Sequence, residues 1–445
     1  MRILEVIHGY PPLYNAGSEV YTQTVARALR AAGHHVSVFC REEDPYRPSF
    51  ALRKSLDDGD CSIPIYLVNH AQSRNRFRHE GLEEAFACVV ETEHPDVVHF
   101  GHLNHLSLGL PEIAKRVGCR VALTLHDYWL ACPRGQFLQM RLGEAEAWQD
   151  CEGQEDNRCA RHCFSRDWTG VTKDEIDLGY WSKWTHLRME EVHRQLRFID
   201  VLLSPSQHLR TRVAKELRLE PGEILFEPYG FDRARLAGRV RTREEDLVFG
   251  FMGRITPAKG IHQLLEAIGG TRGPARLRVW GTLGEPDRAA LLRQVAELPG
   301  DRPERVSWMG GYRNEELVHE VLNHLDVLVV PSIWDENSPL VIHEAQQARV
   351  PVITSDRGGM GELVRHGVNG WTFRHRDASA LAARLQQAID SPDQLLRLGA
   401  RGYLGSRDGQ VPSIGEHVGR LEALFAGGRV RDGDPGSPPA ILAGA

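Results

Sequence analysis

The sequence contains no run of hydrophobic residues that approaches the roughly 20 needed to cross a bilayer. It also lacks a strong charge imbalance, because 54 Lys and Arg residues against 60 Asp and Glu give a formal net charge of −6. Broad electrostatic binding to nucleic acid is therefore not expected. Residues 1–8 form a strand pattern with a charge in its middle, unlike a signal peptide. We expect a cytoplasmic protein that binds no nucleic acid.

Two nucleotide-binding fingerprints are also missing. The sequence has neither G-x-G-x-x-G after a strand nor G-x-x-x-x-G-K-[ST]. The first absence argues against a dinucleotide-dependent oxidoreductase, and the second against a P-loop enzyme. The chain of 445 residues is too long for one hydrophobic core, so two domains and a tail are expected.

Strand patterns alternate with amphipathic helix patterns in both halves of the chain. A strand at 3–7 is followed by a helix ending at Gly33 and a strand at 35–40, and the alternation restarts with a strand at 247–251. Such alternation predicts an α/β fold with parallel sheets, helices on both faces and ligands at the carboxyl ends of the strands. We place the domains at 1–232, with a cysteine-containing insertion at about 130–185, and at 233–410. A returning helix at 411–426 and a disordered tail at 427–445 follow.

Residues 327–344 combine a strand, a loop and a helix start. The apolar run 327–330 is stopped by Pro331, and Ser338 and Pro339 are typical of a helix N-cap and first helical residue. Free amides at a helix start favour anions. Glu344, on the same helix face as Leu340, is suited to paired hydroxyls such as a ribose diol. Phosphate and diol together indicate a nucleotide, although an ordinary strand–helix unit with solvated glutamates remains the alternative.

A second cluster of residues is also suited to binding phosphates. The segment G-F-M-G-R-I-T-P-A-K-G at 250–260 follows another apolar strand. It places the guanidinium of Arg254 and the ammonium of Lys259 in one tight loop. These two cations suit two neighbouring phosphates.

The two clusters together resemble a known family. Glu336 and Glu344 have E-x7-E spacing, and with G-R-x-x-P-x-K-G they resemble the donor site of retaining GT-B glycosyltransferases of the GT4 type, the glycosyltransferase group 1 family. The resemblance implies two Rossmann-like domains facing a cleft, with the acceptor bound by 1–232 and the donor by 233–410. It also implies transfer of a sugar from a UDP-, GDP- or other nucleotide sugar to a glycan, lipid-linked or small-molecule acceptor, with retention, in polysaccharide biosynthesis.

The resemblance also implies residue roles. Glu336 and His126 would contact the donor sugar, Asp127 the acceptor, and Glu344 the ribose. No cofactor is required, because the cations and the helix start replace a divalent metal. The catalytic candidates are His126, Asp127, Arg254, Lys259 and Glu336. The substrate-binding candidates are Gly17, Glu19, Gly281, Tyr312, Asn337, Ser338, Pro339, Leu340, Val341 and Glu344.

Two of these assignments have alternatives. From chemistry alone, His126 and Asp127 form an acid/base couple, while a structural histidine remains open. The family loop often reads G-G-x-E, and residues 16–19 here keep only the second glycine, Gly17, and the acid, Glu19. The first glycine position is therefore a departure from the family pattern.

Four of the eight cysteines gather in the insertion, at Cys132, Cys151, Cys159 and Cys163. Clustered cysteines in a cytosolic chain favour a metal over disulfides, and four thiolates close a tetrahedral zinc site. The spacing C-x18-C-x7-C-x3-C is looser than paired zinc motifs. Structural zinc and free thiols both remain open.

Residues 41–80 are poorly patterned, with Arg74, Arg76 and Arg78 around Phe77. They suit either peripheral contact with the anionic inner face of a membrane or a solvated loop. Two other functions also stay open: a nucleotide-sugar epimerase on the same fold, against which the large acceptor-side insertions argue, and a non-catalytic nucleotide-sugar-binding protein.

Overall fold

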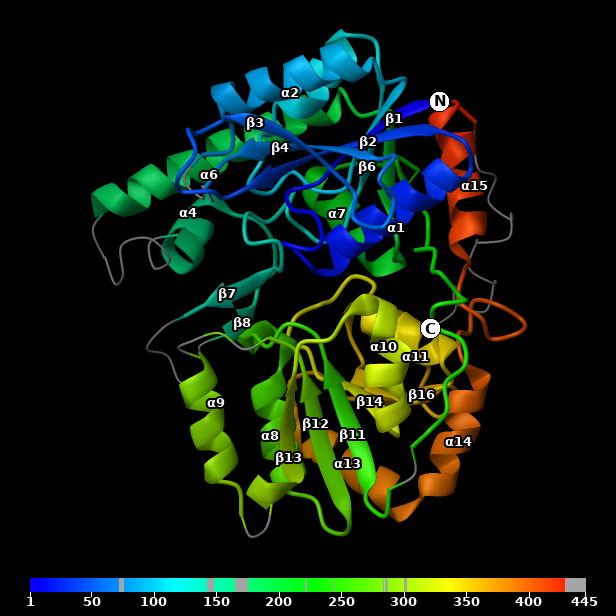
Figure 1. The fold of residues 1–445 in the computed structure, drawn as a ribbon. Coiled ribbons are helices and arrows are strands. Elements are labelled where there is room, and N and C mark those ends of the chain that lie inside the picture. The colour runs from blue at the N-terminus through cyan, green and yellow to red at the C-terminus, as the bar shows by residue number, and fades with distance from the viewer. Residues whose placement is uncertain are drawn as a thin grey trace. The chain divides into compact units, whose positions relative to one another are not determined.

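The computed structural model describes residues 1–71, 76–141, 148–164, 175–220, 222–242, 244–282, 284, 287–299 and 302–428. They divide into two compact units, shown in Figure 1. Unit 1 comprises Met1–Tyr229 and the described residues from Ile414 onward, and unit 2 comprises Gly230–Ser413. Most of the predicted tail, 429–445, and parts of the predicted insertion, 142–147 and 165–174, lie outside the described residues.

Unit 1 is built on an eight-stranded sheet of order β10-β9-β6-β5-β1-β2-β4-β3. Every neighbouring pair is parallel except β3 with β4. Its strands are β1 (Arg2–Val6), β2 (His35–Glu42), β3 (Leu52–Leu56), β4 (Pro64–Asn69), β5 (Val97–Phe100), β6 (Arg120–Thr124), β9 (Val201–Ser204) and β10 (Ile224–Phe226). The strand order reverses between β1 and β5, where parallel α/β sheets bind ligands at the carboxyl ends.

The helices of unit 1 connect these strands. They are α1 (Gly17–Ala31), α2 (Glu80–Glu93), α3 (Leu110–Arg116), α4 (Asp156–Cys159), a π-helical turn (Ala160–Phe164), α6 (Glu175–Leu196), α7 (Gln207–Leu217) and α15 (Ile414–Phe425). A short hairpin of β7 (Leu138–Met140) and β8 (Trp148–Asp150) lies before α4. Helix α15 comes from the end of the chain and packs against α1.

A series of buried hydrogen bonds connects α15 to the rest of unit 1. The Tyr21 hydroxyl lies 2.8 Å from His417 Nε2, and His417 Nδ1 lies 2.8 Å from Glu227 Oε1. Arg420 donates to the same carboxylate at 2.8 Å. Because His417 and Glu227 are only 1% and 4% exposed, the bonds compensate groups that would be costly to bury alone.

Unit 2 contains a six-stranded parallel sheet of order β13-β12-β11-β14-β15-β16. Its strands are β11 (Leu247–Met252), β12 (Ala275–Trp280), β13 (Val306–Gly310), β14 (Val327–Val330), β15 (Val352–Ser355) and β16 (Gly370–Phe373). In chain order this is 3-2-1-4-5-6, the doubly wound arrangement that binds ligands where the order reverses. That point lies between β11 and β14, which Figure 1 shows side by side.

The helices of unit 2 are α8 (Ile261–Gly269), α9 (Asp287–Ala296), α10 (Leu317–Glu320), α11 (Leu340–Gln347), α12 (Gly358–Leu363), α13 (Ala378–Asp390) and α14 (Pro392–Arg401). Apolar residues of the sheet and of α8 and α13 form one buried core, which includes Phe249, Leu264, Leu277 and Leu385. The predicted fold class, α/β with parallel sheets and helices, is confirmed in both units.

The poorly patterned region 41–80 contains two strands that the sequence did not indicate, β3 and β4. Strand β3 is an antiparallel edge strand with little buried apolar surface. The turn after it is held by Asp57, which accepts hydrogen bonds from Arg27 Nε at 2.8 Å and from the Tyr10 hydroxyl at 3.0 Å. These partners lie far away in the sequence, so no local pattern reveals the turn.

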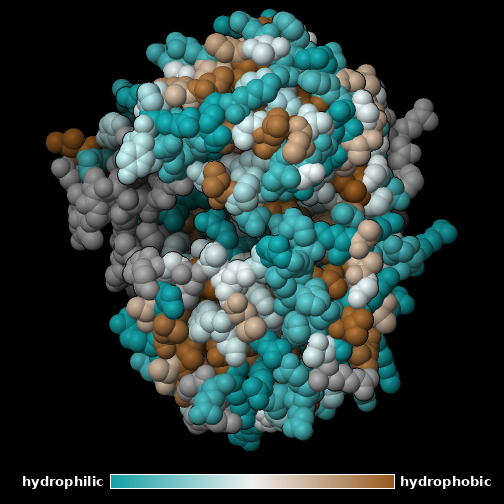
Figure 2. Space-filling model, viewed as in Figure 1, coloured by the Kyte–Doolittle hydropathy of each residue, from teal (hydrophilic) through white to brown (hydrophobic). Residues whose placement is uncertain are grey.

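Within the described residues, no helix is both long and apolar enough to cross a membrane. On the face that Figure 2 shows, hydrophobic residues lie in small separate groups among hydrophilic ones.

The loop after β14 and the first turn of α12 touch backbone to backbone. A Cβ added at Gly359 would lie 1.3 Å from the carbonyl oxygen of Asn337, so a side chain cannot fit without a backbone shift. The Gly359 amide also donates to the carbonyl of Glu336 at 2.7 Å. Glycine at this position therefore sets the path of the loop that carries Glu336.

We expect Gly359→Ala to destabilise unit 2 by about 1–3 kcal/mol, the typical cost of forcing extra atoms into a packed site. Urea denaturation would measure it. Gly311→Ala is the matched control in the same unit, because its Cβ would meet its nearest atom, Thr282 Cγ2, at an ordinary 3.6 Å. Equal unfolding midpoints for the two variants would contradict the steric argument.

Candidate functional site

The loops after β11 and β14 meet at the point where the strand order of unit 2 reverses. Lys259 Nζ, from the first loop, lies 2.6 Å from Glu336 Oε1 in the second. The same oxygen accepts the Ser332 hydroxyl. The Glu336 side chain is 7% exposed and that of Lys259 is 32% exposed. The Glu336 carboxylate is therefore buried and bound by Ser332 and Lys259, while Lys259 itself is partly exposed to solvent.

Arg254 belongs to the loop that carries Lys259, and its side chain is exposed. No ion pair to it is found within the described part of the chain. In this loop, Lys259 is therefore paired with Glu336, while the Arg254 side chain is exposed to solvent.

Glu344 lies in α11 and is 6% exposed. Its Oε1 is bound at 2.8 Å by Arg235 Nη2, while Arg235 Nη1 donates to the Asn314 carbonyl at 2.6 Å. Tyr312 lies near this carboxylate. Burial raises the pKa of the Tyr312 hydroxyl, and the negative charge of Glu344 raises it further. Glu344 is thus bound by Arg235 and lies near Tyr312.

Arg235, which binds the candidate site residue Glu344, was not revealed by the sequence, because residues 233–246 read as a charged linker. Its partner Glu344 is 109 positions away. A neighbouring arginine is also hydrogen-bonded within unit 2, because Arg239 donates to the carbonyls of Leu322 and Leu325, both at 2.8 Å. A run of arginines that alternate with small residues was the only available signal.

The helix start at 338–341 differs from the prediction by one residue. Helix α11 begins at Leu340, Pro339 occupies the cap position, and no side chain caps the helix. Ser338 instead forms a 2.9 Å hydrogen bond with Nε2 of His343, a ring whose pKa burial lowers to about 3. The prediction of Ser338 as N-cap was wrong because its hydroxyl has a buried partner within the helix. Asn337 and Ser338 are buried beside Glu336.

Gly281, predicted to bind substrate, has a structural reason to be glycine. Its φ is +152°, and a Cβ there would lie 2.0 Å from the carbonyl oxygen of Gly253. The residue therefore allows the loop after β12 to pack on the loop after β11. Its amide donates to the Gly310 carbonyl at 2.7 Å.

In unit 1, the loops after β1 and β5 also meet where the strand order reverses. His8 Nε2 lies 3.3 Å from Glu19 Oε1, and the Ser18 hydroxyl donates to Glu19 Oε2 at 2.7 Å. Burial opposes the charge of Glu19, but these two hydrogen bonds outweigh it and lower its pKa to about 2. Gly17 is the exposed first residue of α1.

Asp127 pairs with His102 rather than with its neighbour His126. His102 Nε2 lies 3.3 Å from Asp127 Oδ2, while His102 Nδ1 accepts the Asn104 amide at 2.9 Å. The amide of Trp129 donates to Asp127 Oδ1 at 2.7 Å. Burial opposes the charge of Asp127, but His102 and this amide keep its pKa below the ordinary value. The acid/base couple predicted from adjacency, His126 with Asp127, is replaced by Asp127 with His102.

His126 has a different environment. Its Nδ1 lies 2.6 Å from the Tyr229 hydroxyl, and the two rings stack with centroids 5.5 Å apart. Burial lowers the pKa of His126 to about 3 and raises that of Tyr229. At neutral pH, therefore, the hydrogen bond joins a neutral imidazole to a protonated tyrosine hydroxyl.

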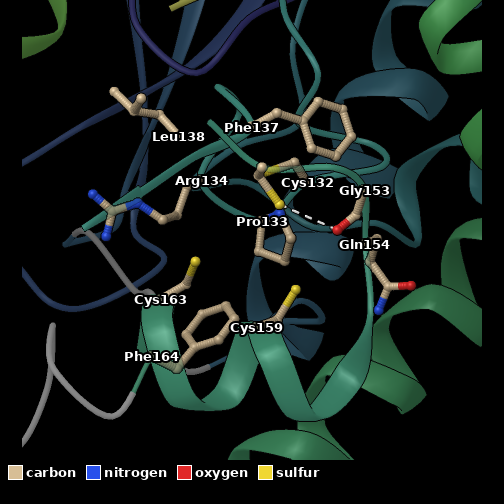
Figure 3. Close-up of a pocket in the computed structure, with 11 residues that line it drawn as sticks. Cys132, Pro133, Arg134, Phe137, Leu138, Gly153, Gln154, Cys159, Cys163 and Phe164 are labelled. Atoms are coloured by element: carbon tan, nitrogen blue, oxygen red, sulfur yellow. Dashed lines mark hydrogen bonds between the residues drawn. The ribbon is translucent and has the colours of Figure 1, made fainter. Parts of the chain in front are cut away.

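The four clustered cysteines line one cavity in unit 1 (Figure 3). They are free thiols in the structure. As placed, no group of three or more His, Cys, Asp or Glu side chains in the described ranges is arranged to hold a metal ion.

The basic segment around Phe77 faces the protein at two of its positions. The Phe77 ring contacts Trp184 with centroids 5.6 Å apart. Arg78 donates to Glu83 at 2.6 Å and to Glu191 at 2.9 Å. Arg74 lies outside the described residues, and Arg76 is exposed.

Comparison with known proteins matches both units. The family described as glycosyl transferases group 1 matches residues 232–404, and the glycosyl transferase 4-like domain matches residues 16–151. The chain is 29% identical over 195 residues to a colanic acid biosynthesis glycosyltransferase, WcaL, of Salmonella typhimurium, covering 42% of this chain and 47% of that protein. That alignment thus spans about half of the relative's length.

Two other matches span nearly the whole chain. An MMP alpha-(1->4)-mannosyltransferase of Mycolicibacterium hassiacum is 28% identical over 427 residues, covering 87% of this chain and 89% of that protein. The solved structure of HepE from Anabaena, in complex with UDP and glucose, has a TM-score of 0.67 at 17% identity, covering 96% of this chain and 99% of that one.

Each unit matches its own glycosyltransferase domain, and solved GT-B structures match nearly the full chain. The resemblance found in G-R-x-x-P-x-K-G and E-x7-E is thereby confirmed, and the chain belongs to the group 1 glycosyltransferases of the GT4 type.

Proposed function

We propose that the protein transfers a sugar from a nucleotide-sugar donor to an acceptor hydroxyl with retention of anomeric configuration, without a divalent metal at the donor site. The observation that carries the proposal is the Lys259–Glu336 pair. It joins the two loops at the reversal point of the unit 2 sheet, where doubly wound folds bind nucleotides.

The donor diphosphate would bind the cations of Arg254 and Lys259 and the amides at the start of α11. Free amides and the helix dipole both favour an anion there. The ribose would bind Glu344, whose Oε1 is held by Arg235, so that Oε2 can accept ribose hydroxyls. The HepE complexes with UDP and UDP-glucose, on a similar fold, support a nucleotide sugar as donor.

Glu336 would position the donor sugar. Its Oε1 is bound by Lys259 and Ser332, and its Oε2 can accept sugar hydroxyls. As the glycosidic bond lengthens, negative charge grows on the leaving nucleoside diphosphate. Fixed cations stabilise that charge more in the transition state than in the ground state, and so lower the barrier. Lys259 and Arg254 thus do what a divalent cation does in other sugar-nucleotide enzymes.

Unit 1 would bind the acceptor. The neutral His126 would hydrogen-bond a hydroxyl of the donor sugar, and the Asp127 carboxylate would accept a hydrogen bond from the incoming hydroxyl. Glu19 and Gly17 lie at the same edge of the unit 1 sheet. The similarity to a colanic acid biosynthesis glycosyltransferase supports a glycan acceptor, free or lipid-linked. A lipid-linked acceptor would place the reaction at the inner face of the membrane.

A thermal-shift screen of UDP, GDP, ADP and their sugars, with and without EDTA, tests donor binding. We expect one nucleotide to raise the Tm by mass action, and the shift to survive EDTA because protein cations hold the diphosphate. The matching nucleoside is the control, since it lacks the diphosphate. Loss of the shift in EDTA would contradict metal independence. The absence of a shift with every nucleotide would contradict the donor site.

Proton NMR of the product tests retention. With an α-linked donor, we expect the new anomeric proton to show the small coupling of an α-linked gluco- or galacto-configured sugar. A large coupling would establish inversion and overturn the mechanism. Isomerisation of the donor in the absence of acceptor would favour the epimerase, and donor binding without turnover in any acceptor mixture would favour the binding protein.

Two variants separate charge stabilisation from donor binding. Lys259→Ala should lower kcat by about 10²-fold, since it removes a cation that acts mainly on the leaving group. Glu344→Gln should weaken donor affinity by about 10-fold through a lost charged hydrogen bond, with a smaller effect on kcat. Steady-state kinetics measures both, with Lys215→Ala and Glu266→Gln on exposed helix positions as controls. Wild-type kinetics in both variants would contradict the site assignment.

A further inference from the structure

Three separate segments of unit 1 bring four cysteines to one cavity. Cys132 follows the segment 126–131, Cys151 follows β8, Cys159 ends α4, and Cys163 lies in the π-helical turn. Figure 3 shows the side chains of Cys132, Cys159 and Cys163 pointing toward the same space. These three residues are 7%, 6% and 8% exposed, and Cys151 is half-buried. Nothing in the donor or acceptor chemistry uses them.

The cavity is small and apolar. Phe137, Leu138 and Phe164 contribute to its lining, and its volume of about 10 Å³ leaves room for a single atom-sized occupant. A cavity of this size holds one ion but no organic ligand. The helical turn that carries Cys159 and Cys163 packs through Phe164 on Trp181 of α6, with ring centroids 5.2 Å apart. Cys159 and Cys163 therefore lie on a helical segment that is held in place by packing against α6.

The four thiols are near neighbours around this cavity, and three of them are buried. Four neighbouring thiols can lose their protons together only if a cation binds them, and metal ions deprotonate coordinating thiols outright.

A buried arginine, Arg188, would compensate part of the negative charge of a metal–thiolate cluster. Arg188 of α6 is 1% exposed and stacks on Trp129 at 4.4 Å. It donates to the carbonyls of Leu130 and Trp129, and no carboxylate in the described residues forms an ion pair with it. Cys132, Cys159 and the Asp127 carboxylate lie within electrostatic range of its guanidinium. A buried arginine is costly unless negative groups lie close, and a zinc–thiolate cluster would add to the negative charge that Asp127 supplies.

We propose that Cys132, Cys151, Cys159 and Cys163 bind one zinc ion as a tetrahedral, purely structural site. Zinc is the divalent ion that four thiolates and a closed tetrahedral shell select. Binding replaces four S–H protons by four Zn–S bonds, and the resulting cluster carries two negative charges beside Arg188 and Arg134. Because the side chains are not yet arranged as ligands, binding rotates them inward. Cys151 then gives up its 3.2 Å hydrogen bond to the Gly153 carbonyl.

The proposed site fixes the loop that carries Asp127. The Tyr128 amide donates to the Gly135 carbonyl at 3.1 Å, and the Cys132 amide to the Tyr128 carbonyl at 2.7 Å. A Cβ at Gly135 would lie 2.8 Å from Asp127 Oδ2, so the turn and the carboxylate are in direct contact. Anchoring Cys132 on the metal therefore braces the acceptor side of the enzyme, and zinc takes no part in sugar transfer. The proposal stands independently of the proposed donor and acceptor.

Metal analysis of the full-length protein, purified without chelators, tests the site. We expect about one zinc per chain, lost in Cys159→Ser and Cys163→Ser. Cys61→Ser and Cys88→Ser are the matched controls, because both residues are exposed and lie outside the cluster. A chelator should also lower the Tm of wild type toward that of the Cys159→Ser variant, since the binding energy stabilises the fold.

A second measurement covers the case in which the serine variants fail to fold. Wild-type protein stripped of metal and titrated with Co²⁺ should show the intense thiolate-to-cobalt absorption and visible bands of a tetrahedral four-sulfur site, saturating at one equivalent. Absence of both zinc and the cobalt spectrum would overturn the proposal. So would bound iron, disulfides among the four cysteines, or equal zinc loss from the Cys61 and Cys159 variants.

Discussion

Close packing of backbone on backbone at the carboxyl ends of the strands is the constraint on which the unit 2 site depends. Gly359 lies against the carbonyl of Asn337, and Gly281 against the carbonyl of Gly253. A side chain at either position would push these segments apart. The loops that carry Lys259 and Glu336 also touch through the main chain, because a Cβ at Gly260 would lie 1.9 Å from the carbonyl oxygen of Pro331, and the Ile333 amide donates to the Ala258 carbonyl at 2.9 Å. These main-chain contacts bring the two loops together, and the 2.6 Å ion pair between Lys259 and Glu336 spans them.

The same design repeats in the acidic residues. In Glu336 and Glu344 one oxygen is held by a cation, Lys259 and Arg235 respectively, while in Asp127 the Trp129 amide binds one oxygen and His102 lies 3.3 Å from the other. A carboxylate fixed in this way loses little further freedom when it accepts a hydroxyl. In the proposed function, such preorganisation would reduce the entropic cost of orienting a sugar or a ribose. For Asp127, the bonds from its partners also keep the pKa below the ordinary value in spite of burial.

The sequence predicted what local pattern encodes. Strand β14 was found at its observed bounds because an apolar run stops at a proline, and the Lys259 and Glu336 loops were found because each follows such a strand. Long-range pairing was not predictable. Asp57 forms the turn after β3 through Arg27, Arg235 reaches Glu344, and His102 rather than His126 faces Asp127. Each of these pairs is made by the fold, so adjacency in the chain misled or gave no signal. The one-residue error at Ser338 has the same origin, since a buried histidine competes for its hydroxyl.

The path of the chain through α15 has a consequence for synthesis. Unit 1 begins at Met1 but includes His417, whose two ring nitrogens bind Tyr21 and Glu227. On the ribosome, unit 2 has its full sequence by Ser413, before the last helix of unit 1 has been made. Until that helix arrives, a tyrosine and a glutamate of the nascent chain lack the partner that makes their burial tolerable. The domain translated first is therefore the domain completed last, because its final helix is synthesised only after the whole of Gly230–Ser413.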